Sequence, residues 1–305
     1  MLATPTLGLQ RRGRTGHGMY RKRKSTSQLH ATNALRYTLP FLLDPKSSKL
    51  SSDKSSSKRV FLLGPSHHYY LTKCALTRCT TYATPLGNLK VDKATSDKLN
   101  KTGLFQYMSR DVDEDEHSLE MHLPYIYKML SRNFADESSF PSLVPIMVGT
   151  TSASTEETVG KLLAPYLADP DNAFVISSDF AHWGTRFRYT YYVDNNGNAT
   201  SLQSGDRTPK APLIHESIKQ VDFQCIEACE TGSHQVWLDV LGETGNTVCG
   251  RHPIGVVMAG LEEAERQGLR HTGNGRFRFV RYERSSEVTR ISDSSVSYAS
   301  AFAVL

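Results

Sequence analysis

Histidine, aspartate, cysteine and arginine side chains follow three apolar runs of this sequence. They are His67 and His68 in "GPSHH", Asp179 and His182 in "SSDFAHWG", and Cys249, Arg251 and His252 in "CGRHP". Imidazole groups bind iron, copper and zinc, and a thiolate favours the softer ions. No spacing among these residues matches a zinc finger. They therefore predict either a divalent-metal site or a hydrogen-bonded polar pocket, and the residues alone do not separate the two.

A fourth polar stretch, "DVDEDEHSLEMHLPYI" at 111–126, contains His117, Glu120 and His122. The order H-x-x-E-x-H is neither H-E-x-x-H nor H-x-x-E-H, so the residues do not form a metalloprotease helix. Two interpretations stay open. The acidic residues could begin a helix and complement its dipole, or His117 and Glu120 could point into the pocket.

The elements that position these residues alternate between buried strands and amphipathic helices. The runs "RVFLLG", "SLVPIMVG" and "AFVISSDF" predict strands, and Pro145 in the second predicts an edge strand or a bend. Three helices are predicted, in "TEETVGKLLAPYLADP" with a cap at Thr155, in "IHESIKQVDFQCIEACETG", and in "PIGVVMAGLEEAERQG" beginning at Pro253. This alternation predicts an α/β domain whose sites lie beyond the carboxyl ends of strands, where His67 and Asp179 fall.

Charge is divided unevenly along the chain. Residues 1–58 carry twelve Lys and Arg against two Asp, a net of +10, and the remaining 24 basic and 29 acidic residues give −5. The first segment also has seven serines between Ser47 and Ser57, which predicts a poorly ordered region. Within it, only 33–43, "NALRYTLPFLL", is predicted to pack as a short helix. The acidic body has no basic groove, so we expect no nucleic-acid partner.

The cellular compartment is predicted from weaker signals. No apolar run approaches the roughly 18 residues that span a bilayer, so we expect no membrane role. Five cysteines, an odd number in a chain of 305 residues, favour reduced thiols and a cytoplasmic location. The basic run "RKRK" is compatible with an additional nuclear location, and the Arg- and Ser-rich beginning is a weaker indication of mitochondrial import.

Six segments of 59–305 resemble the Memo family, named for a mediator of receptor-tyrosine-kinase-driven cell motility. They are "VFLLGPSHHYYLTKCAL", "YATPLGNLKVD", "DEDEHSLEMHLPYIYKML", "YLADPDNAFVISSDFAHWGTRFRYTYY", "NTVCGRHPIGVV" and "DSSVSYASA". The resemblance implies a single α/β domain at 59–305, similar to class III extradiol dioxygenases and related non-haem iron enzymes. Its central, largely buried mixed β-sheet would be flanked by helices, with the pocket at the carboxyl edge.

The resemblance also implies a metal site for copper or iron. Two family ligands map onto His67 and Cys249, with His68 supporting His67 and with Asp179 and His182 lining the cavity. Ala181 stands where many relatives carry cysteine. A third ligand belongs to the family's N-terminal Pro-His-Ala-Gly-Tyr segment. Neither that segment nor the Ser-His-Ala-Gly-Ser-Trp-Tyr opening is found in residues 1–58. We therefore expect the first family strand to be missing and metal binding to be weak or absent.

The residues and the family resemblance together leave three functions open. The first is a metal-dependent oxidoreductase linked to cell motility and cytoskeletal signalling, although a thiolate in place of the usual carboxylate ligand argues against ring cleavage. The second is a non-catalytic adaptor that binds phosphotyrosine or other peptides of a signalling protein, with Arg186, Arg188 or Arg251 pairing with phosphate. The third, with the least support, uses Cys249 as a nucleophile activated by His182 or His252.

Overall fold

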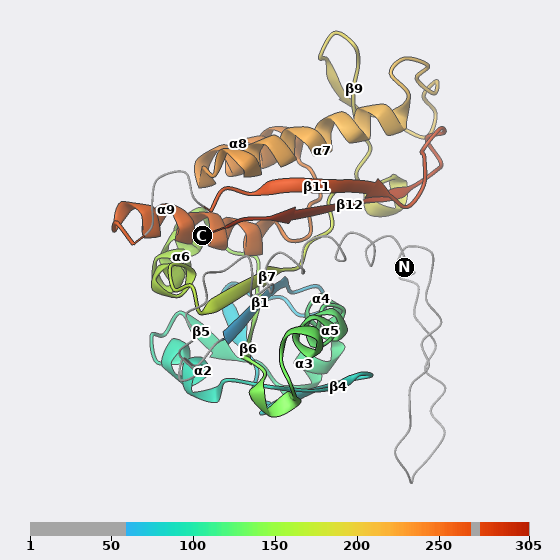
Figure 1. The fold of residues 1–305 in the computed structure, drawn as a ribbon. Helices are drawn as coiled ribbons and strands as arrows, with labels where there is room; N and C mark the ends of the chain where they lie inside the picture. The colour runs from blue at the N-terminus through green and yellow to red at the C-terminus, as the bar shows by residue number, and fades with distance from the viewer. Residues whose placement is uncertain (1–58, 270–274, 305) are drawn as a thin grey trace.

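The apolar run that begins at Arg59 forms a buried strand, β1 (Arg59–Pro65), inside a five-stranded sheet of order β5-β2-β6-β1-β7 (Figure 1). β1 pairs in parallel with β6 (Ser142–Val148) and with β7 (Asn172–Ile176). β2 (Cys74–Leu76) pairs antiparallel to β6 and parallel to β5 (Phe105–Tyr107). The predicted α/β class with a mixed central sheet is confirmed.

The structure is a computed structural model that describes residues 59–269 and 275–304. The expectations for residues 1–58, including the short helix at 33–43 and the missing family strand, lie outside the described residues. Within the described ranges, no helix is both long enough and apolar enough to cross a membrane.

Helices cover both faces of the central sheet because successive side chains of a strand point to opposite sides. Phe61 and Leu63 of β1 pack in one cluster with residues of α6 (Ala153–Leu167) and α9 (Arg251–Arg266). Val60 and Leu62 pack on the other face with residues of α5 (Leu123–Asn133). A strand buried on both faces must be apolar throughout, which is why β1 reads as one continuous hydrophobic run.

A second layer lies beyond α9 and contains a three-stranded sheet of order β11-β12-β8 (Figure 1). Its strands pack beside α7 and α8, where Trp237 is fully buried in a separate core. The elements of this layer are β8 (His182–Trp183), β9 (Tyr191–Val193), β10 (Ala199–Ser201), α7 (Ile214–Thr231), α8 (His234–Thr244), β11 (Arg278–Arg284) and β12 (Ser295–Phe302). The remaining elements are β3 (Thr81–Thr84), β4 (Gly87–Lys90), α2 (Lys93–Asn100), α3 (Arg110–Asp115), α4 (His117–Glu120), η1 (Glu137–Ser139) and η2 (Thr185–Phe187).

The edge strand predicted from Pro145 is wrong, because β6 lies between β1 and β2. On the side of β6 that faces away from β1, residues near Pro145 are paired but Pro145 itself is not. The proline is tolerated for this reason. Ile146 begins the pairing with β2, and Leu143 bridges to Val91. Pro145 falls between these two contacts, where the ladder is interrupted.

Two helix starts lie earlier in the chain than predicted. α6 is capped by Ser152, whose hydroxyl accepts from the Thr155 N–H, rather than by Thr155. α9 begins at Arg251, with Gly250 as its N-cap, rather than at Pro253. Both shifts place additional polar residues in a first helical turn at the carboxyl edge of the sheet, and His252 is one of them.

Candidate functional site

Three parallel strands deliver polar residues to one edge of the central sheet. β1 leads to His67, β6 leads to Thr151 and the first turn of α6, and β7 leads to Asp179. The carboxyl ends of parallel strands meet at the same edge, which is where α/β proteins build their sites. The segment before α9 brings Cys249 to this edge.

Reciprocal hydrogen bonds join the loop after β7 to the loop before α9. The Asp179 N–H donates to the Cys249 Sγ at 3.0 Å, and the Cys249 N–H donates to the Asp179 carbonyl at 3.2 Å. The Gly250 N–H donates to the Ser178 hydroxyl at 3.1 Å. These contacts place Asp179 beside Cys249 although 70 residues separate them in sequence.

Burial makes the anionic forms of Asp179 and Cys249 unfavourable. It raises the pKa of Asp179, against the opposing effect of the nearby His182 and His67. Burial also raises the pKa of the Cys249 thiol to about 12, and the charge of Asp179 acts in the same direction. A cation placed beside the two groups would reverse this effect, so the pair has the chemistry of a metal-binding donor set.

Glu116 holds the ring of His67 in a fixed orientation. The Glu116 Oε1 lies 2.9 Å from the His67 Nδ1, and its Oε2 accepts from the His67 backbone N–H at 2.6 Å. Burial acts to raise the pKa of Glu116, but the hydrogen bonds with His67 and with the Ser118 N–H outweigh it and lower that pKa to about 2. An ionised carboxylate only accepts hydrogen bonds, so Nδ1 carries the proton and the Nε2 lone pair is left for a ligand.

His182 is held in the same manner by backbone carbonyls. Its Nδ1 lies 3.0 Å from the Phe180 oxygen and 3.2 Å from the Thr247 oxygen, so this nitrogen is the donor. Its backbone N–H donates to the Thr247 hydroxyl at 2.8 Å. The Nε2 of His182 is thereby also left with a lone pair.

One compact group of ligand-type atoms occurs among the described residues, formed by His67, Glu116 and His117. Their ligand atoms all lie within 4.8 Å of one another. The His67 and His117 rings stack with centroids 4.5 Å apart, and His68 lies edge-on to His117 at 5.5 Å. The contact that supports His67 therefore comes from Glu116, and His67, His68 and His117 are all exposed residues.

The polar residues singled out in 111–126 do not lie together in the structure. His117 lies beside His67, whereas Glu120 is exposed. His122 is buried, and its Nδ1 donates to the Ser118 carbonyl at 3.0 Å. The chain achieves this by breaking the segment into α3, α4 and α5, so His117 and His122 do not share one helix.

The three candidate arginines lie in different surroundings. Arg188 is exposed and lines a cavity of about 570 Å³ together with Tyr189, Tyr191, Gln203 and other residues. The Arg186 guanidinium lies over the Phe187 ring, 4.4 Å from its centroid. Arg251 begins α9, and its carbonyl accepts from the Trp237 indole N–H at 3.1 Å.

Two carboxylates were not singled out from the sequence. Glu116 belongs to an acidic run in which composition gives no sign of which member is buried. Glu156 stands in the first turn of α6, where an acidic residue is ordinarily an exposed partner of the helix dipole. Both are 1% exposed, and both bind histidine rings.

The Memo-like protein family model matches residues 46–302, which is most of the chain. The chain belongs to the Memo-like family. Protein MEMO1 of Danio rerio is 44% identical over 247 residues, which cover 81% of this chain and 75% of the relative. Protein MEMO1 of Homo sapiens is 42% identical over the same shares. A MEMO1 family protein of Schizosaccharomyces pombe is 41% identical over 82% of this chain and 80% of its own.

A solved structure of an uncharacterized Escherichia coli protein is less similar to this Memo-like chain than the relatives above. Its TM-score is 0.44 at 13% identity, over 85% of this chain and 91% of that chain. This likeness carries no conclusion about activity. The Memo-like assignment stands on the family model and on the identities above 40%.

Proposed function

We propose that this chain is a metal-binding protein of redox type, with His67 and Cys249 as ligands of a copper or iron ion. The observation that carries the proposal is the partly buried Asp179–Cys249 pair, an acid and a thiol held side by side by reciprocal contacts at the edge of the sheet where His67 lies. His67 acts electrostatically on Asp179 from across the edge of the sheet. A bound copper or iron ion would supply one-electron redox chemistry.

The two nitrogens of His67 offer different positions for a metal. On the Nδ1 side, Glu116 and His117 complete the compact group of ligand-type atoms. Both oxygens of Glu116, however, already accept hydrogen bonds there, one from the His67 N–H and one from the Ser118 N–H. We therefore assign Glu116 the role of orienting His67 and place the metal on the Nε2 side.

Metal content of the purified protein tests this assignment. Copper, iron and zinc are measured by elemental analysis in the wild-type protein and in the His67→Ala, Cys249→Ser and His117→Ala variants. We expect the first two substitutions to lower the bound metal and His117→Ala to retain it. If His117→Ala loses bound metal and Cys249→Ser retains it, the metal is assigned to the Nδ1 side of His67 instead. Equal content in all four proteins would refute the metal site.

Redox function needs a separate measurement. Metal-loaded protein should consume oxygen in the presence of a reductant, and Cys249→Ser should slow this consumption. The link to cell motility and cytoskeletal signalling belongs to the same proposal, and it rests on family membership alone.

A second candidate function is supported by the cavity beside Arg188. Arg188, Tyr189 and Tyr191 are among the residues that line this cavity of about 570 Å³, and an arginine there is suited to a phosphorylated peptide of a signalling protein. Arg188 also has a left-handed backbone with a φ of 57°, which is uncommon for a residue other than glycine. Weaker phosphopeptide binding by Arg188→Ala, with no dependence on metal, would favour this function over the redox one.

A further inference from the structure

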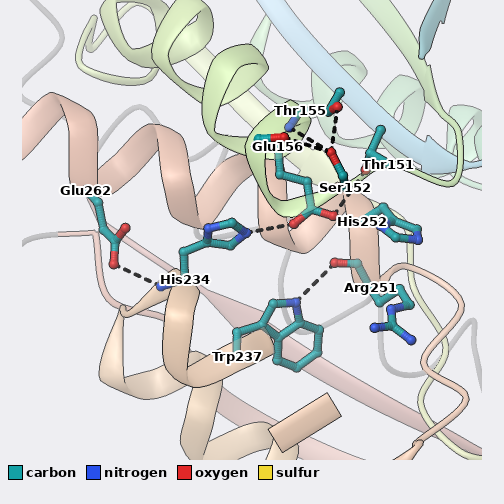
Figure 2. Close-up of polar contacts among 10 residues, drawn as sticks. Thr151, Ser152, Thr155, Glu156, His234, Trp237, Arg251, His252 and Glu262 are labelled. Atoms are coloured by element: carbon teal, nitrogen blue, oxygen red, sulfur yellow. Dashed lines mark hydrogen bonds and ion pairs between the residues drawn. The ribbon is translucent and has the colours of Figure 1, made fainter. Parts of the chain in front are cut away.

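Glu156 binds two histidines on the same edge of the sheet, at a position that the proposed metal ligands do not occupy (Figure 2). Its Oε2 lies 2.7 Å from the Nε2 of His234, and its Oε1 lies 2.6 Å from the Nδ1 of His252. The Thr151 hydroxyl donates to Oε1 at 3.1 Å. These three partners of Glu156 come from different elements. Thr151 follows β6, His234 begins α8, and His252 lies in the first turn of α9.

The carboxylate fixes which nitrogen of each ring carries a proton. Burial acts to raise the pKa of Glu156, but the hydrogen bonds from His234 and His252 outweigh it and lower that pKa. An ionised carboxylate cannot donate, so His234 donates through Nε2 and His252 through Nδ1. In the neutral ring, the lone pair of His252 is therefore on Nε2, which Figure 2 shows turned away from Glu156.

This cluster does not have the geometry of a metal site. Both ring nitrogens instead lie at hydrogen-bond distance from separate oxygens. Gly255 packs against the carboxylate so closely that a Cβ there would collide with Oε2, so the back of the cluster is filled.

The two histidines differ in their access to solvent. The His234 side chain is 4% exposed, and its backbone N–H donates to Glu262 at 2.9 Å, so it serves the interior. The His252 side chain is 19% exposed, in the first turn of α9 and three residues after Cys249. A buried carboxylate behind a partly exposed imidazole is the arrangement that orients a general base and stabilises it when it becomes charged.

We propose that His252 is a proton-transfer residue at this edge of the sheet, with Glu156 as its positioning residue and His234 fixing Glu156 from behind. This inference rests on the proposed function, because the site it serves is the one proposed at Asp179 and at Cys249, which lies three residues before His252 in the chain. The molecule acted on is water or a hydroxylated small molecule. Its O–H bond breaks, an N–H bond forms at the His252 Nε2, and the electron pair remains on the oxygen. The imidazolium formed lies against the negative charge of Glu156.

The first test examines the base without any turnover. Long-range nitrogen–proton NMR spectra report the tautomer of His252. Diethyl pyrocarbonate acylates an unprotonated imidazole nitrogen, and peptide mass spectrometry locates the product. We expect the Nδ1–H tautomer, acylation of His252, and unchanged acylation after addition of stoichiometric copper. An Nε2–H tautomer or an unreactive His252 would overturn the proposal. Protection by copper would overturn it as well, because His252 would then be a metal ligand.

The second test examines proton transfer. In His252→Asn, the amide nitrogen takes the place of Nδ1 and can still donate to Glu156, but the base is lost. We expect metal content to be retained and metal-dependent oxygen uptake to fall about 100-fold, with a change in its pH profile. His215→Asn, on α7, is the matched control and should keep the wild-type rate and profile. A wild-type rate in His252→Asn would overturn the proposal. If the loaded wild-type protein takes up no oxygen, the redox function fails, and the first test decides the assignment of His252.

Discussion

An oxygen acceptor holds the Nδ1 of each of three histidines at the carboxyl edge of the sheet. For His67 and His252 the acceptor is a buried carboxylate, and for His182 it is a pair of backbone carbonyls. In the neutral ring each therefore has its lone pair on Nε2, the form in which imidazole binds metals or accepts protons. These acceptors orient the rings before any ligand arrives, which lowers the entropic cost of forming the site.

Glu116→Gln tests this orientation for His67. An amide has one acceptor oxygen where the carboxylate has two, so it cannot accept from the His67 ring, the His67 N–H and the Ser118 N–H as Glu116 does. We expect copper or iron affinity, measured by competition titration, to fall about 10 to 100-fold. Glu114→Gln is the control, because Glu114 lies on the adjacent α3 and pairs only at the surface with Arg110. Equal affinities of the two variants would contradict the role given to Glu116.

His122 predicts a pH dependence of folding stability. Burial lowers its pKa from 6.5 to about 4, with the Ser118 carbonyl acting weakly in the opposite direction. Above pH 6.5 the ring is neutral in both states. Below pH 6.5 the unfolded chain binds a proton at His122 that the folded chain does not bind. The free energy of unfolding therefore decreases by about 2 kcal/mol as the pH is lowered from 7 to 5.

His122→Asn should remove this part of the acid sensitivity. The amide can still donate to the Ser118 carbonyl, but it does not titrate. Urea unfolding at pH 7 and pH 5 measures the difference for each protein. We expect the variant to be less stable at pH 7, because a smaller side chain leaves a cavity, and yet to lose about 2 kcal/mol less on acidification. Parallel losses in the two proteins would show that His122 titrates normally.

At the scale of elements, a pair of glycines allows α6 and α9 to meet closely. A Cβ on Gly160 would lie 2.6 Å from the Gly260 nitrogen, and one on Gly260 would lie 3.0 Å from the Gly160 carbonyl. These same helices bring Glu156 to His252. The spacing between the helices thus also sets the geometry of the proton-transfer cluster.

Gly160→Ala should separate these helices. The added methyl meets backbone atoms that cannot rotate away, so we expect a loss of about 1 to 3 kcal/mol in the free energy of unfolding. Gly242→Ala is the matched control, because this glycine on α8 has open space around it and alanine should stabilise its helix by up to about 1 kcal/mol. Chemical denaturation compares the two. A neutral Gly160→Ala would show that the helices can move apart without cost.

The elements that the sequence predicts well are those whose burial is nearly complete. β1 is an apolar run because helices cover both of its faces, and the Gly232 that ends α7 has a φ of 76°. The interior position of β6 could not be inferred from Pro145, because its ladder depends on where β2 stops. Likewise, the acidic run at 111–116 does not reveal that Glu116 is the member that turns inward, since this follows from the position of His67 in three dimensions.

At the scale of the whole molecule, charge separates residues 1–58 from the body that the structure describes. The first segment carries a net charge of +10 and the rest of the chain −5. Within the described body, β1 is paired along both edges, with β6 and with β7. The residues assigned to the metal and to proton transfer, His67, Cys249 and His252, also belong to the body. We therefore expect residues 59–305 to hold the functional site.

Deletion of residues 1–58 tests whether that segment supplies a ligand. Its two histidines, His17 and His30, occur in basic or polar stretches without the strand and tight turn that position His67. Ordering such backbone costs about 1 to 2 kcal/mol per residue, so neither is expected to complete the site. Competition titration should give the same copper affinity for the full chain and for 59–305, with circular dichroism verifying that the shorter chain folds. A loss of 10-fold or more in a folded 59–305 would show that a histidine of residues 1–58 binds the metal after all, and His17→Ala and His30→Ala in the full chain would identify which.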